Sequence, residues 1–339
     1  MSSHTLHSPH SVPAPAPSAP RFWSRDLVSI RDLSSHEVQS VLHLAAVMKA
    51  RPEDFRGALA GKQMSLFFEK PSLRTRLTFQ AGMASLGGVS FFMNQTASRL
   101  DARESLADIA RNLERWVDVI VLRTFAHDTV LGMAQHAGIP VINALTDVEH
   151  PCQALADYFT LQEKFGDLRN IQLAYIGDGN NVAHSLMLAC AALGSTIRIA
   201  TPPGYDPNPD VVADAQALAE ETGAVIELFS DPCAAVSGVD AVYTDVWASM
   251  AQEDEADERA NIFAAYQVNN ELLAQAAPDA VFMHCLPAHR GLEVTDEVMD
   301  SPRSVVFDQA ENRIHVQKAV LLLLLGGGMS RLPVRSAHA

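Results

Sequence analysis

The sequence predicts an α/β protein made of two doubly wound parallel-sheet domains that long helices join. Short apolar runs of strand length alternate with segments of helical periodicity along most of the chain. Its 339 residues are enough for two domains of ordinary size. Because strands that alternate with helices pair in parallel, we expect two parallel sheets and a substrate cleft between them.

Composition narrows the class of protein. A hydrophobic content of 48% and a charged content of 19% are typical of a globular chain. The net charge of −15 argues against a nucleic-acid surface or a polybasic membrane anchor, so an anionic substrate would need a local positive site. The four cysteines are scattered and form no CxxC pair, so we predict neither disulfides nor a metal site, and a cytoplasmic location.

Neither end of the chain reads as a targeting or membrane segment. Residues 1–22 are rich in Pro, Ala and Ser and are predicted to be a disordered tail. The apolar run 321–325 is far shorter than the roughly 20 residues that a membrane span needs. We expect it to be the end of a buried helix.

The first half of the chain predicts four strands. A helix after Ser34 or Ser35 precedes the buried strand 64–68, and Pro71 separates this strand from the next helix. A helix from Glu104 is expected to place Leu106, Ile109, Leu113 and Trp116 on its apolar face. The other predicted strands are 89–92, 119–122, which ends at Arg123, and 139–142.

The second half repeats the pattern after a connecting helix at about 150–165. Its predicted strands are 171–176, 197–200, 225–229, 241–244 and 280–283. A last helix, at about 311–326, has no strand after it and could pack back on the first domain. We therefore predict one domain at 23–152 together with the C-terminal helix 311–328, and a second domain at 153–310.

The loop after strand 64–68 is the predicted anion site. Free N–H groups at a helix start, together with the helix dipole, attract an anion. Ser72 and Thr75 add hydroxyl groups, and Arg74 and Arg76 add guanidinium groups that suit phosphate oxygens. An ordinary capped helix with surface arginines is the alternative.

A second loop resembles a dinucleotide site. Gly177-Asp178-Gly179-Asn180-Asn181 follows a strand and opens a helix, but Val182 stands where the third glycine of the G-x-G-x-x-G motif would be. NAD binding is therefore the weaker interpretation of this loop.

Four motifs, in this order along the chain, resemble the signatures of the aspartate/ornithine carbamoyltransferase family, and within it the members that act on ornithine. They are Glu69-Lys70-Pro71-Ser72-Leu73-Arg74-Thr75-Arg76, Glu149-His150-Pro151-Cys152-Gln153, Asp245-Val246-Trp247-Ala248-Ser249-Met250 and His284-Cys285-Leu286-Pro287. The resemblance covers about residues 25–330. Each motif alone is weak to moderate, but four in the right order are strong.

The resemblance implies a site for carbamoyl phosphate. The implied contacts are Ser72, Leu73, Arg74 and Thr75 for the phosphate, Arg123, His150 and Gln153 for the carbamoyl group, Cys285 and Leu286 near it, and Arg313 on the last helix. The family usually has Thr in place of Leu73, although the backbone N–H survives that change. A cation, an imidazole N–H and an amide around one carbonyl oxygen would stabilise a developing oxyanion.

The resemblance also implies an amino-acid site at Asn181, Asp245, Ser249 and Met250. An Asp carboxylate attracts the ammonium of ornithine, whereas it would repel the side-chain carboxylate of aspartate. A helix-capping role is the alternative for Asp245. The chain departs from the family at Ala251, where Gly is usual, and at Arg99, near a usual Gln, so Arg99 receives no role.

The implied reaction is attack of the ornithine δ-amine on carbamoyl phosphate, which gives citrulline and phosphate. Asp245, Cys285, Arg123 and His150 are the expected catalytic residues, with no cofactor, metal or covalent intermediate. The family implies a homotrimer or a multiple of trimers. The alternatives are acetylornithine, succinylornithine or putrescine as acceptor, an NAD-linked oxidoreductase, and a non-catalytic regulatory homologue.

Overall fold

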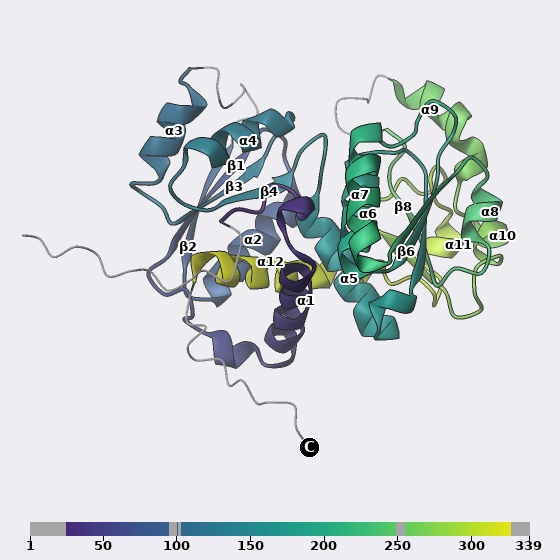
Figure 1. Cartoon of the computed structure of the whole chain (residues 1–339), viewed down its shortest axis with the longest axis horizontal. Helices are drawn as coiled ribbons and strands as arrows, with labels where there is room; N and C mark the ends of the chain where they lie inside the picture. The colour runs from purple at the N-terminus through teal and green to yellow at the C-terminus, as the bar shows by residue number, and fades with distance from the viewer. Residues whose placement is uncertain (1–24, 95–99, 101–102, 249–254, 327–339) are drawn as a thin grey trace, which may run out of the picture.

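The structure is a computed structural model that describes residues 25–94, 100, 103–248 and 255–326. It contains two parallel sheets side by side, with helices around each (Figure 1). The predicted fold class, two parallel-sheet α/β domains, is confirmed. The predicted tail at 1–22 lies outside the described residues.

The first sheet has the strand order β2-β1-β3-β4, and every neighbouring pair is parallel. Its strands are β1 (Gln63–Phe68), β2 (Val89–Asn94), β3 (Val119–Arg123) and β4 (Val141–Leu145). The helices that connect them are α2 (Leu73–Ser85), α3 (Leu106–Leu113) and α4 (His127–His136). Strand order reverses between β1 and β3, so the loops after these two strands meet at one edge.

The second sheet has the order β7-β6-β5-β8-β9 and is also entirely parallel. Its strands are β5 (Gln172–Ile176), β6 (Thr196–Ala200), β7 (Val225–Phe229), β8 (Ala241–Thr244) and β9 (Val281–His284). Its helices are α6 (Asn181–Leu193), α7 (Pro209–Thr222), α8 (Pro232–Val236), α9 (Ala256–Phe263), α10 (Asn270–Leu273) and α11 (Asp296–Met299). Here the order reverses between β5 and β8.

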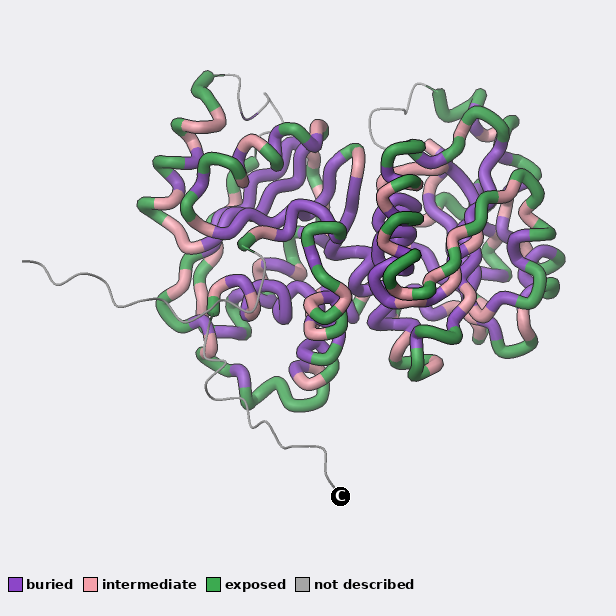
Figure 2. Tube along the Cα trace, viewed as in Figure 1, coloured by how far each residue is buried: buried purple, intermediate pink, exposed green. Residues whose placement is uncertain are grey.

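Three helices hold the sheets together: α1 (Ser35–Ala50), α5 (Pro151–Phe165) and α12 (Val306–Leu325). The last helix packs against α1, α2 and α5, and α5 also packs against α6 of the second sheet. A single apolar core runs through this junction, from Leu66 in β1 to Tyr175 in β5. Buried residues therefore form a continuous region from the first sheet, across these helices, to the second sheet (Figure 2). The predicted division at residues 152 and 153 remains a prediction.

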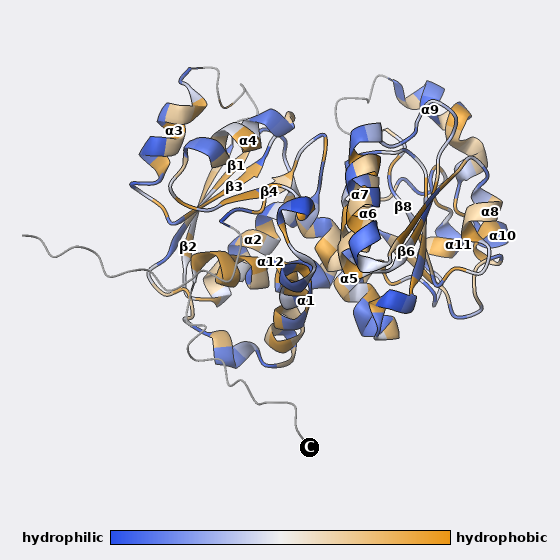
Figure 3. Cartoon of the chain, in the orientation of Figure 1, coloured by the Kyte–Doolittle hydropathy of each residue, from blue (hydrophilic) through white to orange (hydrophobic). Residues whose placement is uncertain are grey.

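Local sequence explains most element ends. Ser34 is the N-cap of α1 and forms a capping box with Glu37. Apolar colour follows the buried strands of both sheets, whereas outer helices such as α3 carry a polar face (Figure 3). Among the described helices, none is long and apolar enough to cross a membrane.

Three predicted boundaries are wrong. Helix α3 ends at Leu113, so Trp116 lies beyond its apolar face and is 64% exposed. Strand β4 begins at Val141 because Pro140 has no N–H to donate to the ladder. Helix α12 begins at Val306, five residues before the predicted start at 311. Just before the helix, Ser304 forms a parallel β-bridge with Phe282 of β9.

Candidate active site

The loop after β1, the predicted anion site, leads into the start of α2 at the first sheet's switch point. Ser72 is the N-cap of α2, and its hydroxyl accepts a hydrogen bond from the Thr75 N–H at 3.3 Å. The side chain of Leu73 is 73% exposed, so only its backbone can serve a ligand in this loop. Arg76 points elsewhere: it lies on the Phe92 ring and donates to Gln80.

Buried cations gather beside this helix start. Arg313 of α12 donates a hydrogen bond from Nη2 to the hydroxyl of Thr75 at 2.8 Å, which joins two elements far apart in sequence. Arg123 is buried at the end of β3. Burial, then the charges of Arg313 and Arg74, lower the pKa of Arg123 to about 10. The positive charges of Arg123, Arg313 and Arg74 therefore lie close enough to repel one another, and an anion among them would relieve this repulsion.

His150 completes this side of the site as a neutral imidazole. Burial first, and then Arg313 and Arg123, hold the pKa of His150 well below its usual value. Its backbone N–H is fixed by the hydroxyl of Ser185 in α6 at 2.8 Å. Because the ring is uncharged, one ring nitrogen can donate and the other can accept.

Three buried polar atoms of these residues have no partner within the described chain: Nδ1 of His150, Oε1 of Gln153 and Nε of Arg313. Buried polar groups in proteins are nearly always hydrogen-bonded, so these three atoms are candidates to bind a ligand. Gln153 differs from expectation, because its amide nitrogen faces Asp157 at 2.8 Å and its oxygen is the atom left over. It offers an acceptor to a ligand.

The second sheet contributes a carboxylate and a thiol at its own switch point. The Sγ of Cys285, after β9, lies 3.0 Å from Oδ1 of Asp245, after β8. Burial, and next the Asp245 charge, raise the pKa of the Cys285 thiol well above its usual value, so the thiol stays protonated and donates. Arg123 lies close enough to Cys285 for the two groups to interact electrostatically, so residues of the two halves meet here.

Asn180 is a site residue for which sequence reasoning assigned no role. Its Nδ2 donates to Oδ2 of Asp245 at 2.9 Å, while its Oδ1 caps α6 by accepting from Val182 and Ala183. The signal was present, since an Asn just before a helix predicts an N-cap. The neighbouring Asn181 donates instead to the carbonyl of Thr146 in the first domain, so it lies where the domains meet.

The loop after β9 has a buried internal support. The Nε2 of His284 lies 3.3 Å from Glu293, and its Nδ1 accepts from the N–H of Leu286. Leu286 has a left-handed φ of 61°. Because its N–H is used internally, Leu286 can offer only its carbonyl to a ligand.

Metal and cofactor binding find little support in the described residues. Asp245, His284 and Cys285 are one group with ligand atoms close enough for a metal, but both ring nitrogens of His284 are already engaged. A Cβ on Gly179 would come within 2.3 Å of the Pro207 nitrogen. Gly179 is therefore needed for packing on the loop at Pro207, and the dinucleotide interpretation loses its physical basis.

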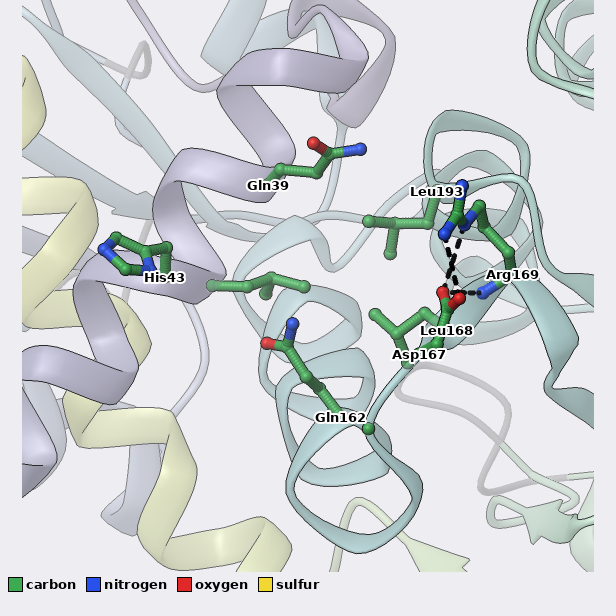
Figure 4. Close-up of a pocket in the computed structure, with 9 residues that line it drawn as sticks. Gln39, His43, Gln162, Asp167, Leu168, Arg169 and Leu193 are labelled. Carbon is green, nitrogen blue, oxygen red and sulfur yellow. Dashed lines mark hydrogen bonds and ion pairs between the residues drawn. The ribbon is translucent and has the colours of Figure 1, made fainter. Parts of the chain in front are cut away.

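Two predicted residues, Ser249 and Met250, lie outside the described residues, as do Arg99 and Ala251. A separate surface pocket of about 470 Å³ lies between α1 and the end of α5 (Figure 4). Its charged pair, Asp167 and Arg169, is exposed and mutually satisfied. The unpartnered buried atoms of the candidate site do not line this pocket.

Comparison with known proteins gives two family matches. The model of the "Aspartate/ornithine carbamoyltransferase, carbamoyl-P binding domain" matches residues 25–163. The model of the "Aspartate/ornithine carbamoyltransferase, Asp/Orn binding domain" matches residues 169–324.

Similar proteins match over nearly their whole length. The chain is 52% identical over 303 residues to the ornithine carbamoyltransferase of Symbiobacterium thermophilum, covering 89% of this chain and 98% of that one. It is 50% identical over 308 residues to that of Thermococcus kodakarensis, covering 89% and 97%. The solved structure of the Pyrococcus furiosus ornithine carbamoyltransferase matches with a TM-score of 0.87 at 49% identity, covering 91% and 99%.

Proposed function

The chain belongs to the aspartate/ornithine carbamoyltransferase family, and we propose that it transfers the carbamoyl group of carbamoyl phosphate to the δ-amine of L-ornithine. The products are L-citrulline and phosphate. One observation carries the proposal: the protonated thiol of Cys285 and the carboxylate of Asp245, 3.0 Å apart, lie beside the buried cation cluster of the other domain. An amine from one half can thus meet an acyl phosphate from the other.

The first domain binds carbamoyl phosphate in this proposal. The phosphate lies at the start of α2, against the backbone and hydroxyls of Ser72 and Thr75 and the guanidinium of Arg74. Arg123 and the neutral His150 donate to the carbonyl oxygen, which becomes an oxyanion when the amine attacks. Arg313, anchored on Thr75, adds positive charge behind the phosphate.

Gln153 and Leu286 recognise the other side of the carbamoyl group in this proposal. The Oε1 of Gln153 and the carbonyl of Leu286 are both acceptors, and the carbamoyl NH₂ is a donor with two hydrogens. The neutral Cys285 thiol donates to Asp245 and lies at the approach of the nucleophile. No covalent bond to the enzyme is required.

The second domain holds ornithine. Asp245 attracts the δ-ammonium and lowers the free energy of its approach, and Asn181, Ser249 and Met250 bind the α-amino and carboxylate end. The δ-ammonium first gives a proton to the Asp245 carboxylate, which later releases it to solvent, and the amine nitrogen then forms a bond to the carbonyl carbon. The C–O bond to phosphate then breaks, and the departing phosphate accepts the remaining proton.

The rival functions have less support. An NAD-linked oxidoreductase would need the Gly177–Asn181 loop for a pyrophosphate, yet Gly179 is occupied by packing at Pro207. Acetylornithine, succinylornithine and putrescine remain the competing acceptors. The compared relatives carry the ornithine name, and that of Pyrococcus furiosus is called anabolic, which supports the direction of arginine biosynthesis.

A homotrimer in the cytoplasm is part of the same proposal. The edge strand β2 exposes Val89, Phe91 and Met93 on one face, and the adjacent α2 exposes Leu73 and Leu77. An apolar patch of this kind marks an interaction surface. Sedimentation analysis should give three times the chain mass of 36.7 kDa, and a monomer would contradict the proposal.

Replacing Arg74 with Ala should raise the KM for carbamoyl phosphate by about 10- to 100-fold, because a charge-assisted hydrogen bond contributes about 1.5 to 3 kcal/mol. Citrulline formation is measured with carbamoyl phosphate varied at saturating ornithine. Arg111→Ala, which removes an exposed arginine of α3, is the control and should match the wild type. An unchanged KM in Arg74→Ala would remove the proposed phosphate site.

A further inference from the structure

A buried carboxylate that the proposed mechanism does not use lies directly behind the site. Asp157 is fully buried where α5, β8 and α12 meet. Gln309 Nε2 donates to its Oδ1 at 2.7 Å, and the Tyr243 hydroxyl donates to its Oδ2 at 3.1 Å. Gln153, one helical turn earlier, donates to the same Oδ1 at 2.8 Å.

The chemistry of this contact fixes which way the Gln153 amide points. Burial raises the pKa of Asp157 to about 7, while the hydrogen bonds from Gln153, Gln309 and Tyr243 favour its ionised form. An ionised carboxylate only accepts hydrogen bonds, so the NH₂ of Gln153 faces Asp157. The amide oxygen is then turned to the opposite side. This Oε1 is buried and lacks a donor within the described chain, so it is available to a donor on a bound ligand.

The ligand chemistry that suits this oxygen is a small N–H donor. Carbamoyl phosphate presents an NH₂ at this place, whereas acetyl phosphate presents a methyl group of similar size. A site built to hydrogen-bond an N–H rejects the analogue that lacks it, because the buried acceptor is left unpaired. The orientation of one amide can therefore set the choice between two acyl phosphates.

We propose that Asp157 is a positioning residue, which holds the Gln153 oxygen toward the carbamoyl amino group and so makes the site prefer carbamoyl phosphate over acetyl phosphate. The inference rests on the proposed function, because it takes carbamoyl phosphate as the ligand of this site. It adds a residue that touches no substrate. Its partners come from positions 153, 243 and 309, on α5, β8 and α12, so the network forms only when these three elements pack together.

The test measures the dissociation constants of carbamoyl phosphate and acetyl phosphate by calorimetry on the full chain, without ornithine. Asp157→Leu keeps a branched side chain, although a larger one, and removes the acceptor. It should lower the preference for carbamoyl phosphate by about tenfold, which corresponds to about 1.4 kcal/mol. Gln153→Leu should lose a similar amount, and combining the two should add little further loss.

Two matched variants separate orientation from a general structural role. Asp157→Asn retains an oxygen that accepts from Gln153 and Gln309, so it should keep the preference within about threefold. Tyr243→Phe removes a donor to Asp157 but leaves the bond to Gln153, so it too should keep the preference. A wild-type preference in Asp157→Leu, or a loss in either control as large as in Asp157→Leu, would overturn the proposal.

Should Asp157→Leu fail to fold, the wild-type crystal structure with carbamoyl phosphate decides. The Gln153 amide should then lie within hydrogen-bond distance of both Asp157 and the carbamoyl nitrogen, and a nitrogen beyond its reach would overturn the inference. Citrulline formation by the wild type tests the proposed function separately. Normal turnover with an unaltered preference in Asp157→Leu would refute only the role of Asp157.

Discussion

Replacing Asp245 with Asn should lower kcat/KM for ornithine by about 10²- to 10⁴-fold, the range for a group that assists proton transfer. The substitution removes the negative charge that attracts the δ-ammonium. It also sets an NH₂ group against the donors that point at the carboxylate, among them the Cys285 thiol, the Asn180 amide and the Val246 N–H. Binding of carbamoyl phosphate should change much less, since its contacts lie in the other domain.

Steady-state kinetics with ornithine varied at saturating carbamoyl phosphate measures this effect. Asp231→Asn is the matched control, because Asp231 is an exposed N-cap in the same domain and Asn caps a helix equally well. Wild-type kinetics in Asp245→Asn, or an equal loss in the Asp231 control, would remove Asp245 from the mechanism.

Replacing Arg123 with Met should lower kcat/KM for carbamoyl phosphate by about 10²- to 10³-fold, the usual loss of an oxyanion-stabilising donor. The same change should leave the ligand-free protein at least as stable as the wild type. Burial and the charges of Arg313 and Arg74 lower the pKa of Arg123 to about 10, so its charged form is destabilised in the folded state. This destabilisation of the folded state by charged Arg123 is present at neutral pH. It disappears as the pH rises past the pKa values of Arg123 in the folded and then the unfolded protein.

Thermal unfolding without ligand, alongside citrulline kinetics, separates the two effects. Activity should fall while the melting temperature stays or rises, which is the pattern expected where a site is strained for function. Arg111→Met, which changes an exposed arginine, should alter neither quantity. A variant of Arg123 that is less stable and fully active would contradict the role given to this cluster.

The inner strands of the sheets could be predicted from sequence because they are buried on both faces and read as apolar runs. Runs such as 119–122 need no knowledge of their neighbours. The ends of helices and strands were harder to predict where a single residue determines them. Strand β4 starts after Pro140, and the apolar periodicity does not show that α3 ends before Trp116.

The residues of the candidate site that lie in motifs directly after predicted strands could be predicted from the sequence. Thr75 and Arg313 meet across 238 positions, and the motif resemblance named both. Asp157 carried no such signal, because its partners Tyr243 and Gln309 lie 86 and 152 positions away along the chain. Only tertiary packing shows that they surround one carboxylate.

An acceptor panel tests the central claim most directly. The full chain is incubated with isotopically labelled carbamoyl phosphate and, separately, with ornithine, acetylornithine, succinylornithine, putrescine or aspartate, and the products are identified by mass spectrometry. The expected result is labelled citrulline from ornithine at a rate far above that for any other amine. Preferred transfer to another amine, or no transfer to any of them, would contradict the claim.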